Sequence, residues 1–193
     1  MSSRYDDEIW LLVPEDPGPP PAHLTAFVRS LGHHGRVLDL GAGDGRLSAE
    51  LAASALTLAD VSGVALERAA ARLPSATAVL AEPDTPLALE DSVFDLVVCA
   101  ETLEHVRDVQ LLLSEARRVL VPGGTLAVTT PANGRRTALA AAARGFERIF
   151  DPLSPHLRFF TPASLAAVLD ATGFDLAGPV RTRAGTLLAV ATR

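Results

Sequence analysis

The stretch "RVLDLGAGDGR" at residues 36–46 decides the fold, because a short apolar run leads directly into three closely spaced glycines. Residues 36–40 predict a buried strand, and Gly41, Gly43 and Gly45 let the backbone turn tightly and approach a ligand without side-chain clashes. The following "LSAELAAS", residues 47–54, predicts a helix. A glycine-rich turn between a strand and a helix is typical of nucleotide-binding α/β proteins, but it is a weak indicator of function by itself.

Strand and helix patterns alternate along the rest of the chain. Alternation of this kind predicts an α/β fold: one Rossmann-like, doubly wound, mostly parallel sheet with an antiparallel C-terminal strand and a ligand at the carboxyl ends of the strands. The strands are expected near residues 56–62, 76–82, 93–100 and 125–131, with a terminal pair at 174–180 and 185–193. The helices are expected at 22–31, at 63–73 with Ser62 as N-cap, and at 108–120 and 162–174.

The length of 193 residues fits one domain with two less regular segments. Residues 1–30 are interpreted as an N-terminal arm and cap, because "PEDPGPPP" at 14–21 is too proline-rich for a helix or a central strand. The apolar "IWLLV" before it is expected to pack back on the body or over a ligand. Residues 31–193 form the main domain, in which 132–160 have weak periodicity and are interpreted as a cap over the substrate.

Composition excludes several kinds of chemistry. All 17 basic residues are arginine, so Schiff-base, pyridoxal and P-loop lysine chemistry is ruled out. The net charge of −6 argues against nucleic acid as a partner. An acidic N-terminus, a single cysteine (Cys99) and the lack of a membrane-length apolar run predict a cytoplasmic protein without membrane association. Richness in alanine and arginine is typical of proteins from bacterial genomes of high GC content. The sequence does not indicate the oligomeric state.

The acid followed by G-x-G-x-G at residues 39–45 resembles the first motif of class I S-adenosylmethionine-dependent methyltransferases. The nicotinamide dinucleotide fingerprint would need a third glycine where Arg46 stands, which argues against an oxidoreductase. The blocks "LTLADVS", "FDLVVCAETLEHV", "EARRVLVPGG" and "HLRFFTPASLAAVLDATGF" follow in the order of the same family, over roughly residues 36–175. The resemblance implies a cofactor-binding methyltransferase domain over residues 31–193.

The resemblance also implies which residues hold S-adenosylmethionine. The glycine loop would line the methionine part, and Asp39 would orient that loop or meet the amino group. Asp60 would accept hydrogen bonds from both ribose hydroxyls. Glu82 would lie on the adenine side, with Asp84 as its rival. The predicted cofactor set is Asp39, Gly41, Ala42, Gly43, Asp60, Val61, Glu82 and Ala100.

A polar cluster, "AETLEHVRD" at residues 100–108, follows the clearest buried strand. In helical geometry Glu101, Glu104 and His105 would share one face. Together with His156 they resemble the divalent-metal site of ubiquinone-biosynthesis O-methyltransferases and small-RNA 2′-O-methyltransferases. Such a metal (Mg, Mn or Zn) would hold a hydroxyl pair of the substrate and lower its pKa. The alternative is an ordinary helix N-terminus with acidic residues in its first turn and His156 capping a loop.

The function predicted from these motifs is methyl transfer from S-adenosylmethionine to a small-molecule acceptor, with oxygen as the favoured atom. If no metal binds, His105 or His156 is the best general base. The alternatives are a small-RNA 2′-O-methyltransferase and a non-catalytic cofactor-binding module. Further polar residues have simpler interpretations: core for Cys99, a solvated turn for His33 and His34, and a charged surface or an anion contact for Arg135, Arg136 and Arg158.

Overall fold

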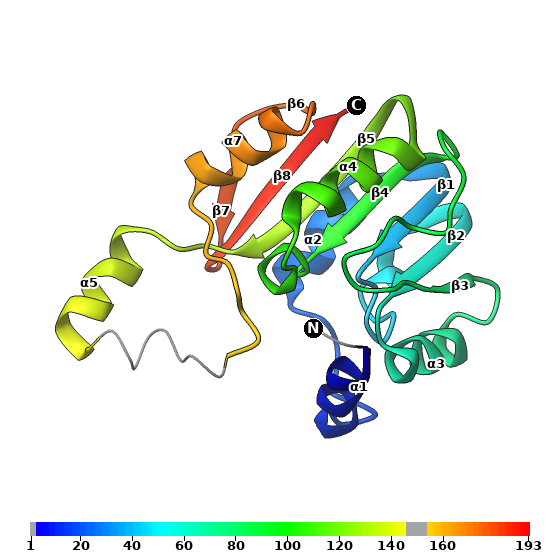
Figure 1. Cartoon of the computed structure of the whole chain (residues 1–193), viewed down its shortest axis with the longest axis horizontal. Coiled ribbons are helices and arrows are strands. Elements are labelled where there is room, and N and C mark those ends of the chain that lie inside the picture. The colour runs from blue at the N-terminus through cyan, green and yellow to red at the C-terminus, as the bar shows by residue number, and fades with distance from the viewer. Residues whose placement is uncertain (1–2, 146–153) are drawn as a thin grey trace.

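The computed structural model describes residues 3–145 and 154–193, which form an eight-stranded sheet (Figure 1). Its strand order is β3-β2-β1-β4-β5-β8-β6, and β7 also pairs with β8. The strands are β1 (His33–Leu40), β2 (Ala52–Asp60), β3 (Thr77–Leu80), β4 (Phe94–Ala100), β5 (Leu120–Pro131), β6 (Asp175–Leu176), β7 (Arg181–Arg183) and β8 (Thr186–Thr192).

The pairing confirms the predicted sheet. Strands β1 to β5 are parallel, whereas β8 runs antiparallel to β5 and pairs antiparallel with both β6 and β7. Consecutive strands run outward from β1 to β3 on one side, and β4 begins the other side next to β1. A crevice forms at the carboxyl ends of the strands where the order reverses, so the fold directs ligands to the ends of β1 and β4.

The described part of the chain contains six α-helices and two 3₁₀ turns. Three of the helices, α3, α4 and α7, begin at a polar N-cap residue, and the predicted cap of α3 at Ser62 is confirmed. Ser62, Asp108 and Thr161 each accept a hydrogen bond from the backbone N–H three residues later. No helix in residues 3–145 and 154–193 is long and apolar enough to cross a membrane. The helices are α1 (Ser3–Leu12), α2 (Ala22–Ser30), α3 (Gly63–Arg72), α4 (Val109–Val119), α5 (Arg135–Arg144) and α7 (Pro162–Ala171), and the 3₁₀ turns are η1 (Ser48–Glu50) and η2 (Leu103–His105).

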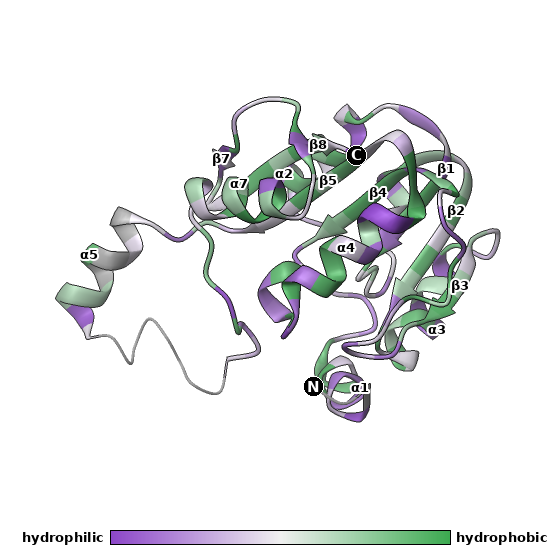
Figure 2. Ribbon diagram, turned by 45° about the horizontal axis from the view of Figure 1, so that its top comes forward, coloured by the Kyte–Doolittle hydropathy of each residue, from purple (hydrophilic) through white to green (hydrophobic). Residues whose placement is uncertain are grey.

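Both faces of the sheet are buried, and successive side chains of a strand point to opposite faces. Leu38 and Cys99 point to the face that α4 and α7 cover, so the core interpretation of Cys99 is confirmed. Val37 and Val98 point to the opposite face, where Val28 of α2 packs against them. Figure 2 shows mostly apolar central strands, flanked by helices such as α4 in which hydrophilic and hydrophobic residues are mixed. This two-sided burial explains why the central strands are continuous apolar runs.

The helix predicted at residues 47–54 is wrong, because only η1 forms there and β2 already begins at Ala52. Strand β1 is about 23 Å long at roughly 3.3 Å per residue, and residues 41–51 must return that distance. As an α-helix, residues 41–51 would span only about 16 Å at roughly 1.5 Å per residue, which is too short, so they form turns and the single 3₁₀ turn η1 instead. The early start of β2 also pairs it with His33 and His34, which lie in β1 and not in the predicted solvated turn.

The segment 132–160, predicted to cap the substrate, is only partly described. Ala132 and Phe160 form a bridge that brings the two ends of the segment together, while α5 stands away from the sheet in both views (Figures 1 and 2). Residues 146–153 and the side chains of Arg135 and Arg136 lie outside the described part of the chain. The capping role of this segment therefore stays a prediction.

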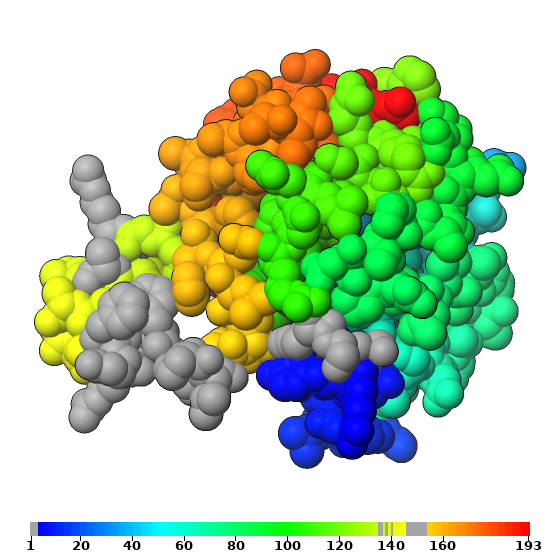
Figure 3. Space-filling model, viewed as in Figure 1, coloured from blue at the N-terminus to red at the C-terminus, as the bar shows by residue number. Residues whose placement is uncertain are grey.

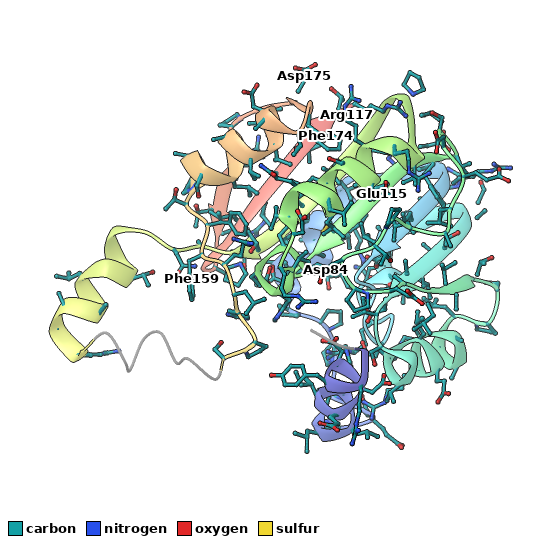
Figure 4. The ribbon with its side chains drawn as sticks, viewed as in Figure 1. Asp84, Glu115, Arg117, Phe159, Phe174 and Asp175 are labelled. Atoms are coloured by element: carbon teal, nitrogen blue, oxygen red, sulfur yellow. The ribbon has the colours of Figure 1, made fainter. Side chains whose placement is uncertain are left out.

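Helix α4 carries the polar contacts that fix two neighbouring segments. Glu115, labelled in Figure 4, accepts hydrogen bonds from the Leu87 backbone N–H at 2.7 Å and from Arg118 at 2.7 Å. Arg118 also donates to the carbonyls of Leu87 and Leu89, at 3.0 and 2.8 Å. Arg117, the residue before Arg118, reaches the end of α7, where its Nε donates to the Gly173 carbonyl at 2.9 Å. The loop after β3 is held by the partly buried ion pair of Glu115 and Arg118.

Replacement of Glu115 by alanine should leave the Leu87 N–H and the Arg118 guanidinium without their shared acceptor. We expect the free energy of unfolding to fall by about 2–3 kcal/mol, measured by urea denaturation. The control is Gln110→Ala on the exposed side of the same helix, which should change it by less than about 0.5 kcal/mol. Equal stability of the two variants would contradict a structural role for the pair.

Candidate cofactor and acceptor site

A cavity of about 330 Å³ opens at the carboxyl ends of β1, β2, β3 and β4. Its wall includes Gly41 after β1, Asp60 at the end of β2, Glu82 after β3 and Glu101 after β4. Helix α1 and residues 105–115 complete the enclosure. The volume lies within the range of small-molecule and cofactor sites, and the position is the crevice that the strand order predicts.

The glycine loop needs its glycines for steric reasons. Gly41 and Gly43 have positive φ angles of 84° and 56°, which side chains rarely allow. A Cβ atom on Gly41 would lie 2.3 Å from Thr102 Oγ1, so the loop packs tightly against the segment after β4. The loop is also fastened to β2: the Gly41 N–H donates to the Ala59 carbonyl at 2.8 Å, and the Gly43 N–H donates to Asp60 Oδ2 at 2.8 Å.

Three of the eight predicted cofactor residues lie behind the cavity wall. Asp39 is only 2% exposed and accepts a hydrogen bond from Ser48 Oγ at 2.6 Å, and burial raises the pKa of Asp39 to about 6. Of its two predicted roles, these contacts support orientation of the loop. Ala42 packs beside the Leu58 cluster and Ala100 belongs to the core. The other five line the cavity: Gly41, Gly43, Asp60, Val61 and Glu82.

The acids at the ends of β2 and β3 differ in their partners. Asp60 Oδ1 accepts a hydrogen bond from the Ser62 N–H at 2.9 Å, and burial raises the pKa of Asp60. The carboxylate of Asp84 is bound by Arg107, whereas no basic side chain in residues 3–145 and 154–193 forms an ion pair with Glu82. Glu82 is thus the acid of the two that is free of an arginine partner.

The polar cluster after β4 does not start a helix, so the expected helical face is wrong. Glu101 has a φ of 52°, η2 follows it, and α4 begins only at Val109 with Asp108 as its cap. The reason is that strand pairing continues through Glu101, whose N–H donates to the Thr129 carbonyl at 2.9 Å. The alternative of a helix N-terminus with acidic residues in its first turn does not hold for α4, whose first turn has none, and Glu104 lies in the short 3₁₀ turn η2. A left-handed glutamate costs about 1–3 kcal/mol, and such strain gathers at functional sites.

Three of the four predicted metal ligands converge in this arrangement. One side-chain ligand atom each from Glu104, His105 and His156 lies within 4.8 Å of the others. Glu104 Oε1 and His105 Nε2 are 3.9 Å apart, and the two imidazole rings meet edge to face with centroids 4.9 Å apart. Glu101 is not in this group; its Oε1 accepts a hydrogen bond from Thr129 Oγ1 at 2.8 Å. It lines the cavity beside the group.

The group is held in place by backbone contacts. The carbonyl oxygen of Glu104 accepts hydrogen bonds from Leu157 and Arg158, at 2.7 and 3.1 Å, which fixes the segment that carries His156. His105 Nδ1 lies 3.2 Å from the Pro155 carbonyl oxygen. Because a carbonyl only accepts, Nδ1 must carry the hydrogen, and the lone pair of Nε2 faces the Glu104 carboxylate. An imidazole nitrogen arranged in this way is suited to bind a cation or to accept a proton.

Burial sets the protonation of the cluster. It raises the pKa of Glu104 to about 7 and lowers the pKa of His105. For Glu101, burial raises the pKa, while a hydrogen bond from Thr129 and the charges of His23 and His156 act in the opposite direction. Neutral side chains are thus favoured when no cation is present. A bound cation would reverse this preference.

One residue of the site, His23, was missed from the sequence. His23 of α2 lies near Glu101 and contacts Thr186 Oγ1 at 3.0 Å, and no sequence pattern pointed to it. The apolar stretch 9–13 was expected to pack on the body or over a ligand, and part of it does line the cavity, but on one face of a helix that also brings in Asp6. That face is made of Asp6, Ile9, Trp10 and Val13.

Glu104→Gln should stabilise the metal-free protein at neutral to alkaline pH. The folded pKa of Glu104, about 7, lies above its usual value of 4.5, so the folded state favours the proton, and stability falls as pH rises from about 4.5 to about 7. Glutamine removes this cost, and we expect about 1–3 kcal/mol more stability at pH 8 but little change at pH 5. Thermal unfolding at both pH values measures it. A loss of stability at pH 8 would contradict the burial argument.

The glycine loop, the buried acids and the sheet order define a nucleotide-cofactor domain. A family profile described as "Methyltransferase domain" matches residues 11–177, and the chain therefore belongs to this family. A structure of an S-adenosylmethionine-dependent methyltransferase from Thermotoga maritima superimposes with a TM-score of 0.70 at 20% identity, covering 98% of this chain and 97% of that one. At that identity the similarity shows the fold.

Curated relatives agree with the family. An uncharacterized methyltransferase of Mycobacterium tuberculosis is 39% identical over 97 residues, 49% of each chain. A ubiquinone biosynthesis O-methyltransferase of Azorhizobium caulinodans is 30% identical over 172 residues, covering 78% of this chain and 66% of that protein. The matched region thus spans about half the length of the first relative and just under two thirds of the second. The chain carries an S-adenosylmethionine-dependent methyltransferase domain.

Proposed function

We propose that this protein binds S-adenosylmethionine in the cavity and transfers its methyl group to an oxygen atom of a small-molecule acceptor. The observation that carries the proposal is the glycine loop fastened to Asp60, which leaves a buried carboxylate beside exposed loop backbone on one cavity wall. The cofactor supplies a methyl group on a positively charged sulfur. The relatives named as O-methyltransferases support oxygen as the accepting atom.

The residues of the cavity fit this cofactor in shape and charge. Gly41 and Gly43 present backbone without side chains to the methionine part, and Asp60 accepts hydrogen bonds from the ribose hydroxyls. Glu82, which has no arginine partner in the described part of the chain, lies on the adenine side. With Glu101 at the other end, carboxylates surround the cavity, and a sulfonium cation is favoured among them.

At the acceptor end, Glu101, Glu104, His105 and His156 would bind a divalent metal ion. Carboxylate oxygens and imidazole nitrogens suit Mg, Mn or Zn, and the convergence of three of these side chains supports the proposal. The ion would hold a substrate hydroxyl and lower its pKa. In the metal-free protein, His105 lines the cavity and holds its hydrogen on Nδ1, so its Nε2 would serve as the general base.

The acceptor that we propose is a small molecule and not RNA. The net charge of −6 and the acidic cavity would repel a phosphate backbone. A gel-shift titration with short RNA at low salt checks this point, and we expect no binding.

Cofactor binding should depend on Asp60. Calorimetric titration of S-adenosylhomocysteine should show about 100-fold weaker binding by Asp60→Ala than by the unchanged protein, since two hydrogen bonds to a charged group are lost. Asp170→Ala, a carboxylate removed from the exposed side of α7, should bind like the unchanged protein. Unchanged affinity of Asp60→Ala would place the ribose elsewhere.

Metal binding is tested with Mn²⁺ on protein stripped of metal. The unchanged protein should take up one ion per chain, and Glu104→Gln and His156→Ala should each lose it, by electron paramagnetic resonance of free Mn²⁺. The control is His33→Ala, an exposed histidine of β1, which should retain uptake. No uptake by the unchanged protein would refute the metal site and leave His105 as the base.

A further inference from the structure

We propose that helix α1 is a cofactor-binding element that closes over bound S-adenosylmethionine, with Asp6 accepting hydrogen bonds from the cofactor and Trp10 covering the glycine loop. This inference rests on the proposed function, because it concerns the same cavity. It goes further in assigning the N-terminal helix to the cofactor and not to the substrate.

The helix presents one face to the cavity. Asp6, Ile9, Trp10 and Val13 follow the spacing i, i+3, i+4 and i+7, and all four line the cavity. The side chains that follow Trp10 point away: Leu11 and Leu12 are 66% and 85% exposed. The orientation of α1 is therefore set by the cavity-facing side chains.

Trp10 lies directly against the glycine loop. A Cβ atom added to Gly43 would lie 2.8 Å from Trp10 Cζ2, so the indole occupies the space that a side chain at position 43 would fill. The indole ring of Trp10 thus covers the loop that would hold the methionine part of the cofactor. Entry and release of a ligand on this side require α1 to move.

Asp6 brings a second carboxylate close to Asp60. Burial raises the pKa of Asp6, and the charge of Asp6 contributes to the raised pKa of Asp60. Within the described ranges 3–145 and 154–193, neither acid forms an ion pair with a basic side chain. Two neighbouring carboxylates on a cavity wall favour a ligand that brings hydroxyl or ammonium donors.

Polar contacts connect α1 to the body and can be broken without opening the core. Asp7 Oδ1 accepts hydrogen bonds from Ser62 Oγ at 2.6 Å and from the Val64 N–H at 3.2 Å, at the start of α3. At the other end of α1, Arg68 donates to the Val13 carbonyl at 3.0 Å. Figure 3 shows α1 as a lobe at the edge of the molecule, as expected of an element that opens locally.

The experiment uses Trp10, the single tryptophan of the sequence, as the reporter. S-adenosylhomocysteine is titrated into the full chain while tryptophan emission is recorded, with calorimetry in parallel. We expect the emission of the unchanged protein to shift on binding and Asp6→Asn to bind roughly tenfold more weakly, the loss expected for one hydrogen bond to a charged group. Glu8→Gln, which removes a charge from the 61% exposed side chain of Glu8 on the same helix, should bind like the unchanged protein.

A second variant tests the closure. Asp7→Ala removes the contact with α3 but not a cavity-lining side chain, so dissociation of S-adenosylhomocysteine, followed by stopped-flow fluorescence, should be several-fold faster. Calorimetric binding with no change in Trp10 emission, or equal affinities of Asp6→Asn and Glu8→Gln, would overturn the inference while leaving the proposed function intact. No calorimetric binding by the folded, unchanged protein would overturn both.

Discussion

The close packing of the glycine loop against Thr102 is the constraint on which the rest of the site depends. The loop leaves β1 with positive φ angles, is fastened by hydrogen bonds to Ala59 and Asp60, and leaves no room for a Cβ atom at Gly41. These contacts fix the ends of β1, β2 and β4 relative to one another. With these strand ends fixed, the backbone of the glycine loop forms one wall of the cavity, and carboxylate side chains line the other walls. That combination suits a positively charged nucleoside cofactor.

The site is assembled at a cost in stability. Asp39, Glu104 and Asp60 all have pKa values raised by burial, so folding makes the charged form of each less favourable than it is in the unfolded chain. Partial compensation comes from single hydroxyl contacts, Ser48 to Asp39 and Thr130 to Glu104. Residues that cost stability and lie around one cavity are characteristic of a functional site, because the ligand supplies the missing favourable interactions.

The fold and the acceptor chemistry depend on different parts of the chain. The sheet and the glycine loop belong to a family architecture that hosts many reactions, so they define the cofactor more than the acceptor. The proposed acceptor end combines side chains from three separate segments. Glu101 and Glu104 follow β4, His156 lies before α7, and His23 comes from α2. If these residues form the acceptor site, as we propose, substitutions in them would alter acceptor choice while leaving the cofactor cavity intact.

Local sequence determined the sheet, the capped helices and the positions of the glycines, because apolar runs, cap residues and positive-φ turns are set by near neighbours. It also placed Asp60, Glu82 and the Glu104–His105 pair at strand ends. Only the tertiary structure decided that residues 47–54 form no α-helix, because β2 already begins at Ala52 to pair with the start of β1. It also decided that Glu101 turns left-handed, because strand pairing with Thr129 continues through its N–H. The apolar stretch at the end of α1 was expected to pack on the body or over a ligand, but its place on this cavity wall and the approach of His23 to Glu101 were decided by long-range packing.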